Sequence, residues 1–238
     1  MIAKFIMCYS FNLMKRLALI IIVLVIIIYF QYNDILKEVN EFQILQYRNP
    51  SKDMLEKILL EKKLTILTDL DIGTIKYLNN PVIMITPKLY ASLSQQQHTA
   101  ILKELKSFFS YYYLPMNTKS DISINYEKIK TKTNLKRQTH YRFCICQFLG
   151  LRKVYLFPPN SKENLYYDTS TDTFDVNFWD QNTVKYPGIK DAKYIEILVY
   201  PGQAIFIPNG WIFCYEMEDN GMSVSFYSES IFSNMLKI

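Results

Sequence analysis

The sequence predicts a mainly β domain that carries helices on its N-terminal side (α+β) and follows a membrane-spanning helix. Residues 17–30 are apolar and uncharged, and two later segments show helical spacing of apolar residues. From Asp121 onward, short runs rich in β-branched and aromatic residues alternate with proline and glycine turns. We therefore divide the chain into a flank and transmembrane anchor (1–32), a helical stalk with an α/β part (33–120) and a β domain (121–238).

The apolar run LALIIIVLVIIIYF and its polar flanks approach the roughly 20 residues that span a bilayer. The sequence FQYND at its end lacks the small residues that cleavage requires, so an uncleaved anchor is favoured over a cleaved signal peptide or a buried hydrophobic helix. Lys4, Lys15 and Arg16 precede the run, and no acidic residue lies among the first 30. The positive-inside rule then predicts a single-pass membrane protein with a cytosolic N-terminus.

Charge and cysteine content argue against two classes of protein. Removing the three flanking cations from the 27 Lys and Arg residues leaves 24 basic against 22 acidic residues, so the basic pI does not indicate a nucleic-acid partner. Cys8 lies in the anchor region, and the other three cysteines show no CxxC or CxxH spacing. We expect free buried thiols rather than a zinc site or a disulfide framework, and the partners we expect are a membrane and an unidentified protein.

The abundance of Lys, Ile, Asn and Tyr is typical of an AT-rich genome, such as that of a large DNA virus or a protist. In a virus, the anchor would place the domain on a virion membrane; an endomembrane is the other location that fits.

The N-terminal part should be helical at residues 33–62, with a break at Pro50 and a cap at Ser51 or Asp53. Strands are expected at residues 64–68 and 81–86, and a helix at 94–112. The C-terminal strands should form a closed or sandwiched antiparallel sheet. We expect them around Ile122 and Ile124 and at 141–148, 153–157, 195–200, 203–207, 211–217 and 223–228.

Four segments match one known pattern in order and spacing: QFLGLRKVYLFPP (147–159), YPGI (186–189), PGQAIFIPNGW (201–211) and MSVSFY (222–227). Together they resemble the Jumonji C (JmjC) or cupin-like oxygenases over roughly residues 135–230. The resemblance implies a double-stranded β-helix (cupin or jelly-roll fold), with segments 150–159 and 201–211 in neighbouring strands. The helices at 34–62 and 94–112 should pack outside it.

The resemblance also implies that the family's metal site is lost. Such enzymes hold Fe(II) with a His-x-Asp/Glu pair and a distant His. These positions are occupied here by Arg137, Thr139 and Phe213. The family's 2-oxoglutarate lysine corresponds to Arg152, which keeps the positive charge and could hold a carboxylate.

Alternation along the strands predicts the pocket lining. Tyr141, Phe143 and Trp211 should face the pocket together with Phe213 and Arg152.

The same alternation turns the three cysteines of the β domain, Cys144, Cys146 and Cys214, away from the pocket. His140 lies three residues after Arg137 and should face away too, exposed or hydrogen-bonded at a strand edge with no carboxylate nearby; a bulge could turn it inward.

The resulting hypothesis is a membrane-anchored, catalytically inactive JmjC/cupin-like domain, a pseudoenzyme with a structural or protein-binding role and without metal or cofactor. One alternative is an Fe(II)/2-oxoglutarate-dependent hydroxylase with a displaced or partner-completed metal site. The other is a metal-free pocket that binds a small carboxylate through Arg152.

Overall fold

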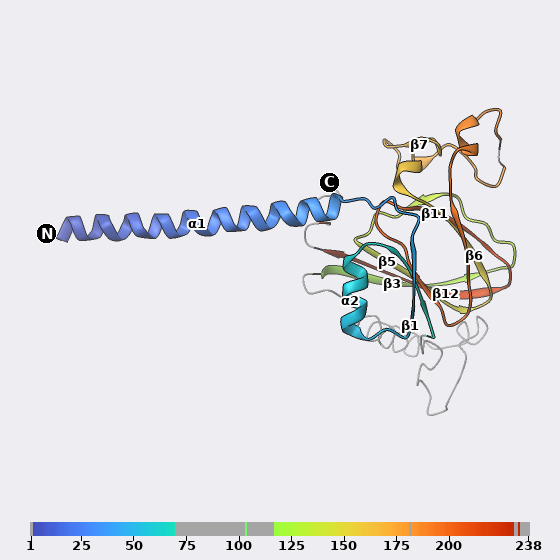
Figure 1. The fold of residues 1–238 in the computed structure, drawn as a ribbon, viewed down its shortest axis with the longest axis horizontal. Coiled ribbons are helices and arrows are strands. Elements are labelled where there is room, and N and C mark those ends of the chain that lie inside the picture. Colours follow the sequence, from blue (N-terminus) through green and yellow to red (C-terminus); the bar gives the residue numbers. More distant parts are fainter. Residues whose placement is uncertain (1, 70–102, 104–116, 181, 231–232, 234–238) are drawn as a thin grey trace, which may run out of the picture. The chain divides into compact units, whose positions relative to one another are not determined.

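The computed structural model describes residues 2–69, 103, 117–180, 182–230 and 233 (Figure 1). The strand expected at 81–86 and nearly all of the helix expected at 94–112 lie outside these residues. The chain divides into two compact units, residues 38–230 and the two terminal segments, 1–37 and 231–238, and each unit is described by itself.

The N-terminal unit contains one long helix, α1 (Ile2–Leu36). Within it, the 21 residues Met14–Asp34 have a mean hydropathy of 2.2. At 1.5 Å per residue such a segment is about 30 Å long, which matches the hydrocarbon core of a bilayer. By length and composition, therefore, α1 could cross a membrane.

The second unit is built from two facing sheets, and this mainly β content with few helices fits the cupin or jelly-roll class expected from the sequence (Figure 1). The six-stranded sheet has the order β1 (Ile44–Arg48), β2 (Leu64–Thr68), β10 (Ala204–Phe206), β5 (Arg142–Leu149), β12 (Gly221–Ser230) and β3 (Asn117–Glu127). The four-stranded sheet has the order β4 (Lys136–Arg137), β11 (Ile212–Met217), β6 (Arg152–Phe157) and β9 (Ile195–Val199). A small hairpin, β7 (Tyr167–Asp168) with β8 (Thr173–Phe174), and two 3₁₀ turns, Pro159–Ser161 and Pro187–Lys190, lie in the β6–β9 connection.

Side chains form three apolar layers around the two sheets. Ile145, Ile205 and Leu156 belong to the layer between the sheets. On the outer face of the six-stranded sheet, Leu55 of helix α2 (Lys52–Leu60) belongs to a cluster with the strand residues. Phe157 belongs to a third cluster with side chains of the β6–β9 connection. The alternation within β5 therefore separates an inner from an outer surface, as period-two geometry requires.

The helical stalk expected at residues 33–62 is wrong in its middle part. Helix α1 ends at Leu36, and Ile44–Arg48 forms strand β1, which pairs in parallel with β2. Helix α2 connects these two strands, and Ser51 Oγ accepts a hydrogen bond from Met54 N (3.4 Å) at its N-cap. The unit is thus β-α-β, the connection that a parallel pair requires. Backbone pairing with β2 stabilises the extended conformation of β1, whose own residues are exposed or half-buried, and the local sequence does not reveal that pairing.

Segments 150–159 and 201–211 were also placed wrongly as neighbours. Strand β6 pairs with β9 and β11, whereas β10 pairs with β2 and β5 in the opposite sheet. The reason is that the β5–β6 turn and the β10–β11 turn each lead from the six-stranded sheet to the four-stranded sheet, so β10 and β6 lie in different sheets. At the β5–β6 turn Gly150 has φ +73°, and an added Cβ would lie 2.7 Å from Asn220 O. Glycine alone avoids this contact.

Candidate functional site

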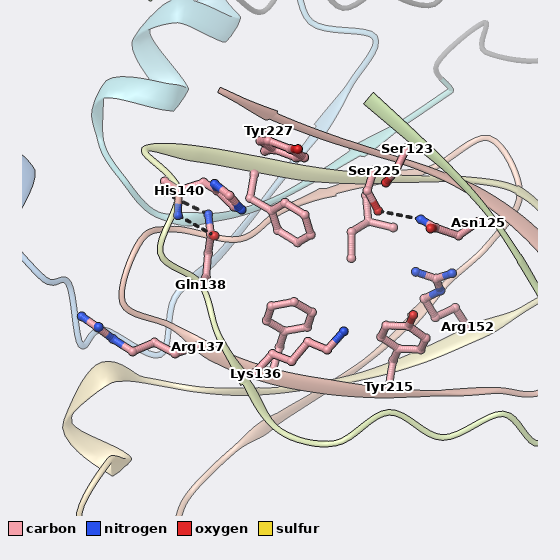
Figure 2. Close-up of a pocket in the computed structure, with 13 residues that line it drawn as sticks. Ser123, Asn125, Lys136, Arg137, Gln138, His140, Arg152, Tyr215, Ser225 and Tyr227 are labelled. Atoms are coloured by element: carbon pink, nitrogen blue, oxygen red, sulfur yellow. Dashed lines mark hydrogen bonds between the residues drawn. The ribbon is translucent and has the colours of Figure 1, made fainter. Parts of the chain in front are cut away.

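A cavity of about 280 Å³ lies between the two sheets (Figure 2). Its walls come from β3, β5 and β12 on one side and β4, β6 and β11 on the other, with the loop before β5 at one end. The lining residues are Ser123, Asn125, Lys136, Arg137, Gln138, His140, Phe143, Ile145, Arg152, Phe213, Tyr215, Ser225 and Tyr227.

Part of the wall is aromatic. Phe143 and Phe213 face each other with ring centroids 5.6 Å apart, and Phe213 is only 6% exposed. Two residues expected in the lining lie elsewhere. Trp211 packs in the core between the sheets and its Nε1 donates to Val39 O (3.0 Å), and the ring of Tyr141 lies 5.4 Å from the Arg142 guanidinium.

Arg152 is a buried residue of the cavity wall, and its guanidinium group is paired with other side chains of the protein. The residue is 1% exposed, and its Nη2 donates to a Glu127 carboxylate oxygen and to Ser223 Oγ (2.7 Å). The Tyr215 ring centroid lies 4.2 Å from its guanidinium carbon, and the Tyr215 hydroxyl donates to the other Glu127 oxygen. The positive charge of Arg152 is therefore balanced within the protein.

Burial acts on the ionisable groups of Arg152 and Tyr215. Burial lowers the pKa of Arg152, because it disfavours the charged guanidinium. The negative charge of Glu127 acts in the opposite direction and favours the protonated form. Burial also raises the pKa of the Tyr215 phenol above its ordinary value. Arg152 Nε has no hydrogen-bond partner and is buried.

Arg137 and Thr139, the residues that the resemblance predicts at the other two ligand positions, do not present donors to the cavity. The Arg137 side chain turns away from the cavity centre, and its Nη2 contacts Glu38 Oε1 (3.3 Å), which Lys162 Nζ also contacts (2.7 Å) (Figure 2). Thr139 is half-buried and is not one of the lining residues. Arg137 is thus used to hold the segment that follows α1.

Lys136 is a cavity residue that sequence reasoning missed. It pairs with Phe213 across β4 and β11, and its side chain points into the cavity toward Tyr215 (Figure 2). Within the part of the chain that the structure describes, its ammonium group has neither an ion-pair nor a hydrogen-bond partner. Strand β4 has only two residues, too few for any alternating pattern to reveal which one points inward.

His140 also lines the cavity, and the expectation that no carboxylate lies near it was wrong. Its Nδ1 is 2.7 Å from Glu229 Oε1, and its ring stacks on Tyr227 at 4.4 Å. Glu229 is 3% exposed, and its Oε2 accepts from Tyr141 N (3.2 Å). Strand β12 brings this glutamate beside β5, a pairing between residues 89 positions apart that the sequence does not show.

The orientation of His140 differs from the expected one because residues 138–141 are not a regular strand. The Gln138 side chain accepts from His140 N (3.0 Å) and donates to His140 O (3.2 Å). This local pairing interrupts the alternation between β4 and β5, so face assignments cannot be counted across it.

The side chains present do not fit Fe(II). Phe213 offers a hydrocarbon ring, and Arg137 a cation directed at Glu38. The described residues contain no group of three His, Cys, Asp or Glu side chains placed to hold a metal ion. His140 and Glu229 supply two candidate ligands, but the carboxylate oxygens already accept hydrogen bonds from the protein. A 2-oxoglutarate carboxylate would likewise compete with Glu127 for Arg152.

The cysteines of the β domain lie away from the cavity. Cys144 and Cys146 belong to the outer layer beside α2, with their sulfur atoms 3.6 Å apart, and Cys214 belongs to the layer outside the four-stranded sheet. All three thiols are free and buried, and burial raises the pKa of Cys144 and of Cys214. These thiols are unsuited to nucleophilic or metal chemistry.

Comparison with known proteins identifies the family. The model of the cupin-like domain matches residues 87–234. Over 132 residues the chain is 29% identical to the lysine-specific demethylase JMJ31 of Arabidopsis thaliana, covering 50% of this chain and 23% of that protein. It is 30% identical over 145 residues to lysine-specific demethylase 8 of Xenopus tropicalis, covering 57% and 32%. A 71-residue match to the arginine-specific demethylase JMJ20 of Arabidopsis thaliana is 35% identical and covers 29% and 15%.

The chain thus spans less than a third of the length of each of these relatives. The matched family model covers more than half of the chain, including both walls of the cavity. The chain belongs to the cupin-like (JmjC) domain family.

Proposed function

We propose that this protein is a membrane-anchored cupin-like domain that does not perform Fe(II)/2-oxoglutarate chemistry and acts by binding. The observation that carries the proposal is Phe213. It occupies the position of the family's distant histidine and packs against Phe143 at 5.6 Å, so a closed aromatic contact stands where a ligand nitrogen would be needed. The role is structural or protein-binding, with a partner still to be identified.

The electrostatics of the site support the same conclusion. A phenyl ring has no lone pair to give a metal ion. If Arg137 rotated back into the cavity, its charge would repel each unit of a metal ion's charge by about 4 kcal/mol at 4 Å and an effective dielectric constant near 20. Neither residue can be recruited as a ligand by a small movement.

Anaerobic titration of the full-length protein in detergent tests this proposal. We expect neither saturable binding of one Fe(II) per chain nor conversion of 2-oxoglutarate to succinate. Stoichiometric binding of both would overturn the proposal.

One observation favours a second candidate, an oxygenase with a displaced metal site. His140 lines the cavity with Glu229 beside it, and the relatives are named as demethylases. Under this alternative, Fe(II) would bind in the titration and His140→Ala would abolish binding.

The anchor is the second part of the proposal. Helix α1 contains a run of about 14–16 large apolar side chains, and burying each in lipid contributes roughly 1.5–3 kcal/mol. We place the N-terminus in the cytosol, because Lys4, Lys15 and Arg16 precede the run, and the membrane as that of a virion or an internal compartment.

Carbonate extraction tests the anchor. The full-length protein should stay in the membrane pellet, and deletion of residues 1–32 should release it. A mature N-terminus near residue 32 would contradict the anchor.

A further inference from the structure

The lining of the cavity is cationic on its inner surface. Three lining residues, Lys136, Arg137 and Arg152, carry positive charge, and none of the 13 is Asp or Glu. The carboxylates that pair with the two arginines, Glu38 and Glu127, are not part of the lining. An anion in the cavity would therefore meet no acidic lining residue, and Lys136 is the lining cation without a carboxylate partner among the described residues.

We propose that this cavity binds a small aromatic acid whose carboxylate pairs with Lys136. The proposal rests on the metal-free function above and names the ligand class of that same site.

Lys136, rather than Arg152, is the group available to an anion. Glu127 and Ser223 already accept hydrogen bonds from Arg152, whereas Lys136 has no partner within the described residues. An unpaired ammonium group in a cavity without an acidic lining residue gains a charge-assisted hydrogen bond from a carboxylate. The ligand's acid group should therefore lie at the β4 side of the cavity.

Side chains from both walls define the rest of the ligand: Phe213 lies beside Lys136 in the four-stranded sheet, and Phe143 lies in the facing sheet. Phe143 and Phe213 pack against each other at 5.6 Å, and a ligand ring could stack on the part of this aromatic pair that lines the cavity. Across the cavity from Lys136 lie hydroxyl and amide groups of β3 and β12, where Asn125 Nδ2 donates to Ser225 Oγ (3.0 Å) (Figure 2). A ring with a carboxylate at one end and a hydroxyl at the other matches both walls.

The volume limits the size of this ligand. About 280 Å³ is just below the range of roughly 300–1,000 Å³ typical of drug-sized ligands. At about 30 Å³ for each water-sized group, it has room for roughly nine such groups. 4-Hydroxybenzoate is a suitable probe of this size and chemistry.

The experiment compares 4-hydroxybenzoate with its neutral isostere 4-hydroxybenzamide on the full-length protein in detergent, by calorimetry and saturation-transfer NMR. We expect the acid to bind at least tenfold more tightly than the amide. Lys136→Met should weaken acid binding at least tenfold without changing amide binding, and Lys136→Arg should retain it.

Lys132→Met is the matched control, because this lysine lies four positions earlier and contacts Glu216 (3.4 Å) and the Trp179 ring (4.7 Å). It should leave binding of the acid unchanged. Equal affinity for acid and amide, or no loss in a folded Lys136→Met protein, would overturn the inference.

The outcomes also separate this inference from the proposed function. If the protein binds neither Fe(II) nor the acid, the ligand proposed here is wrong and the metal-free function still stands. A protein that binds the acid only when Fe(II) is present would overturn both.

Discussion

Arg152 and Arg137 line the same cavity from the two strands that flank β11, yet their surroundings are opposite. Arg152 is 1% exposed and lies in a closed network with Glu127 and Tyr215. The Arg137 side chain is 26% exposed and contacts the surface carboxylate of Glu38. The two residues are of the same type, so the difference in burial is what distinguishes their ion pairs. We expect the buried pair of Arg152 to stabilise the β domain, and the partly exposed pair of Arg137 to hold only the segment around Glu38.

The largest effect should come from breaking the buried pair. Glu127→Ala leaves the Arg152 charge buried without its partner, and we expect the free energy of unfolding to fall by about 3–5 kcal/mol. Urea unfolding measures the loss. The double variant Glu127→Gln with Arg152→Met should be less destabilised than Glu127→Ala; a Glu127→Ala loss below about 1 kcal/mol would show that the two arginines do not differ in this way.

Tyr215→Phe should have the next largest effect. The variant keeps the ring against Arg152 but removes the hydroxyl that donates to Glu127. Hydrogen bonds to charged groups contribute about 1.5–3 kcal/mol, and we expect a loss in that range by the same urea assay. Tyr227→Phe is the control, because its hydroxyl contacts the exposed Asp121 (3.0 Å) and should matter less.

We also expect the stability of the protein to depend on pH in the alkaline range, because of the Tyr215 phenol. Burial raises its pKa in the folded state, so above the ordinary value of 10.0 the unfolded chain loses the proton first. The unfolded state then binds fewer protons, and stability must fall as pH rises above about 10, by up to about 1.4 kcal/mol per pH unit for this group. The decrease in the free energy of unfolding between pH 9 and 11 should be smaller in Tyr215→Phe than in the unmodified protein. An identical decrease would show that other groups cause the pH dependence.

The smallest effect should come from the surface pair. Arg137→Gln removes one of two cations on Glu38, and such pairs contribute about 0.2–1 kcal/mol. Limited proteolysis should show faster cleavage near residues 37–41, whereas the melting of the β domain should hardly change. A loss comparable to that of Glu127→Ala would refute the distinction.

The parts of this site that could be predicted from sequence are those set by local alternation. Phe143 and Phe213 line the cavity and the cysteines face outward, because each lies in a continuous strand with a period of two. The fold class was indicated by the four segments that resemble the JmjC or cupin-like oxygenases, one of which contains Gly150 with its φ of +73°.

The remainder depends on contacts between distant strands. Glu127 meets Arg152 across 25 positions and Glu229 meets His140 across 89, and no local pattern encodes either pairing. Strand β1 could not be predicted because it forms by pairing with β2, about 20 residues later in the sequence, and its own residues are exposed or half-buried. Lys136 lies in a strand too short to show a period.

Metal analysis of the full-length protein, purified from membranes without chelators, is the most direct test of whether the protein has an iron centre. We predict iron far below one atom per chain, unchanged by His140→Ala. Near-stoichiometric iron that disappears in His140→Ala would contradict the claim and identify His140 as a metal ligand.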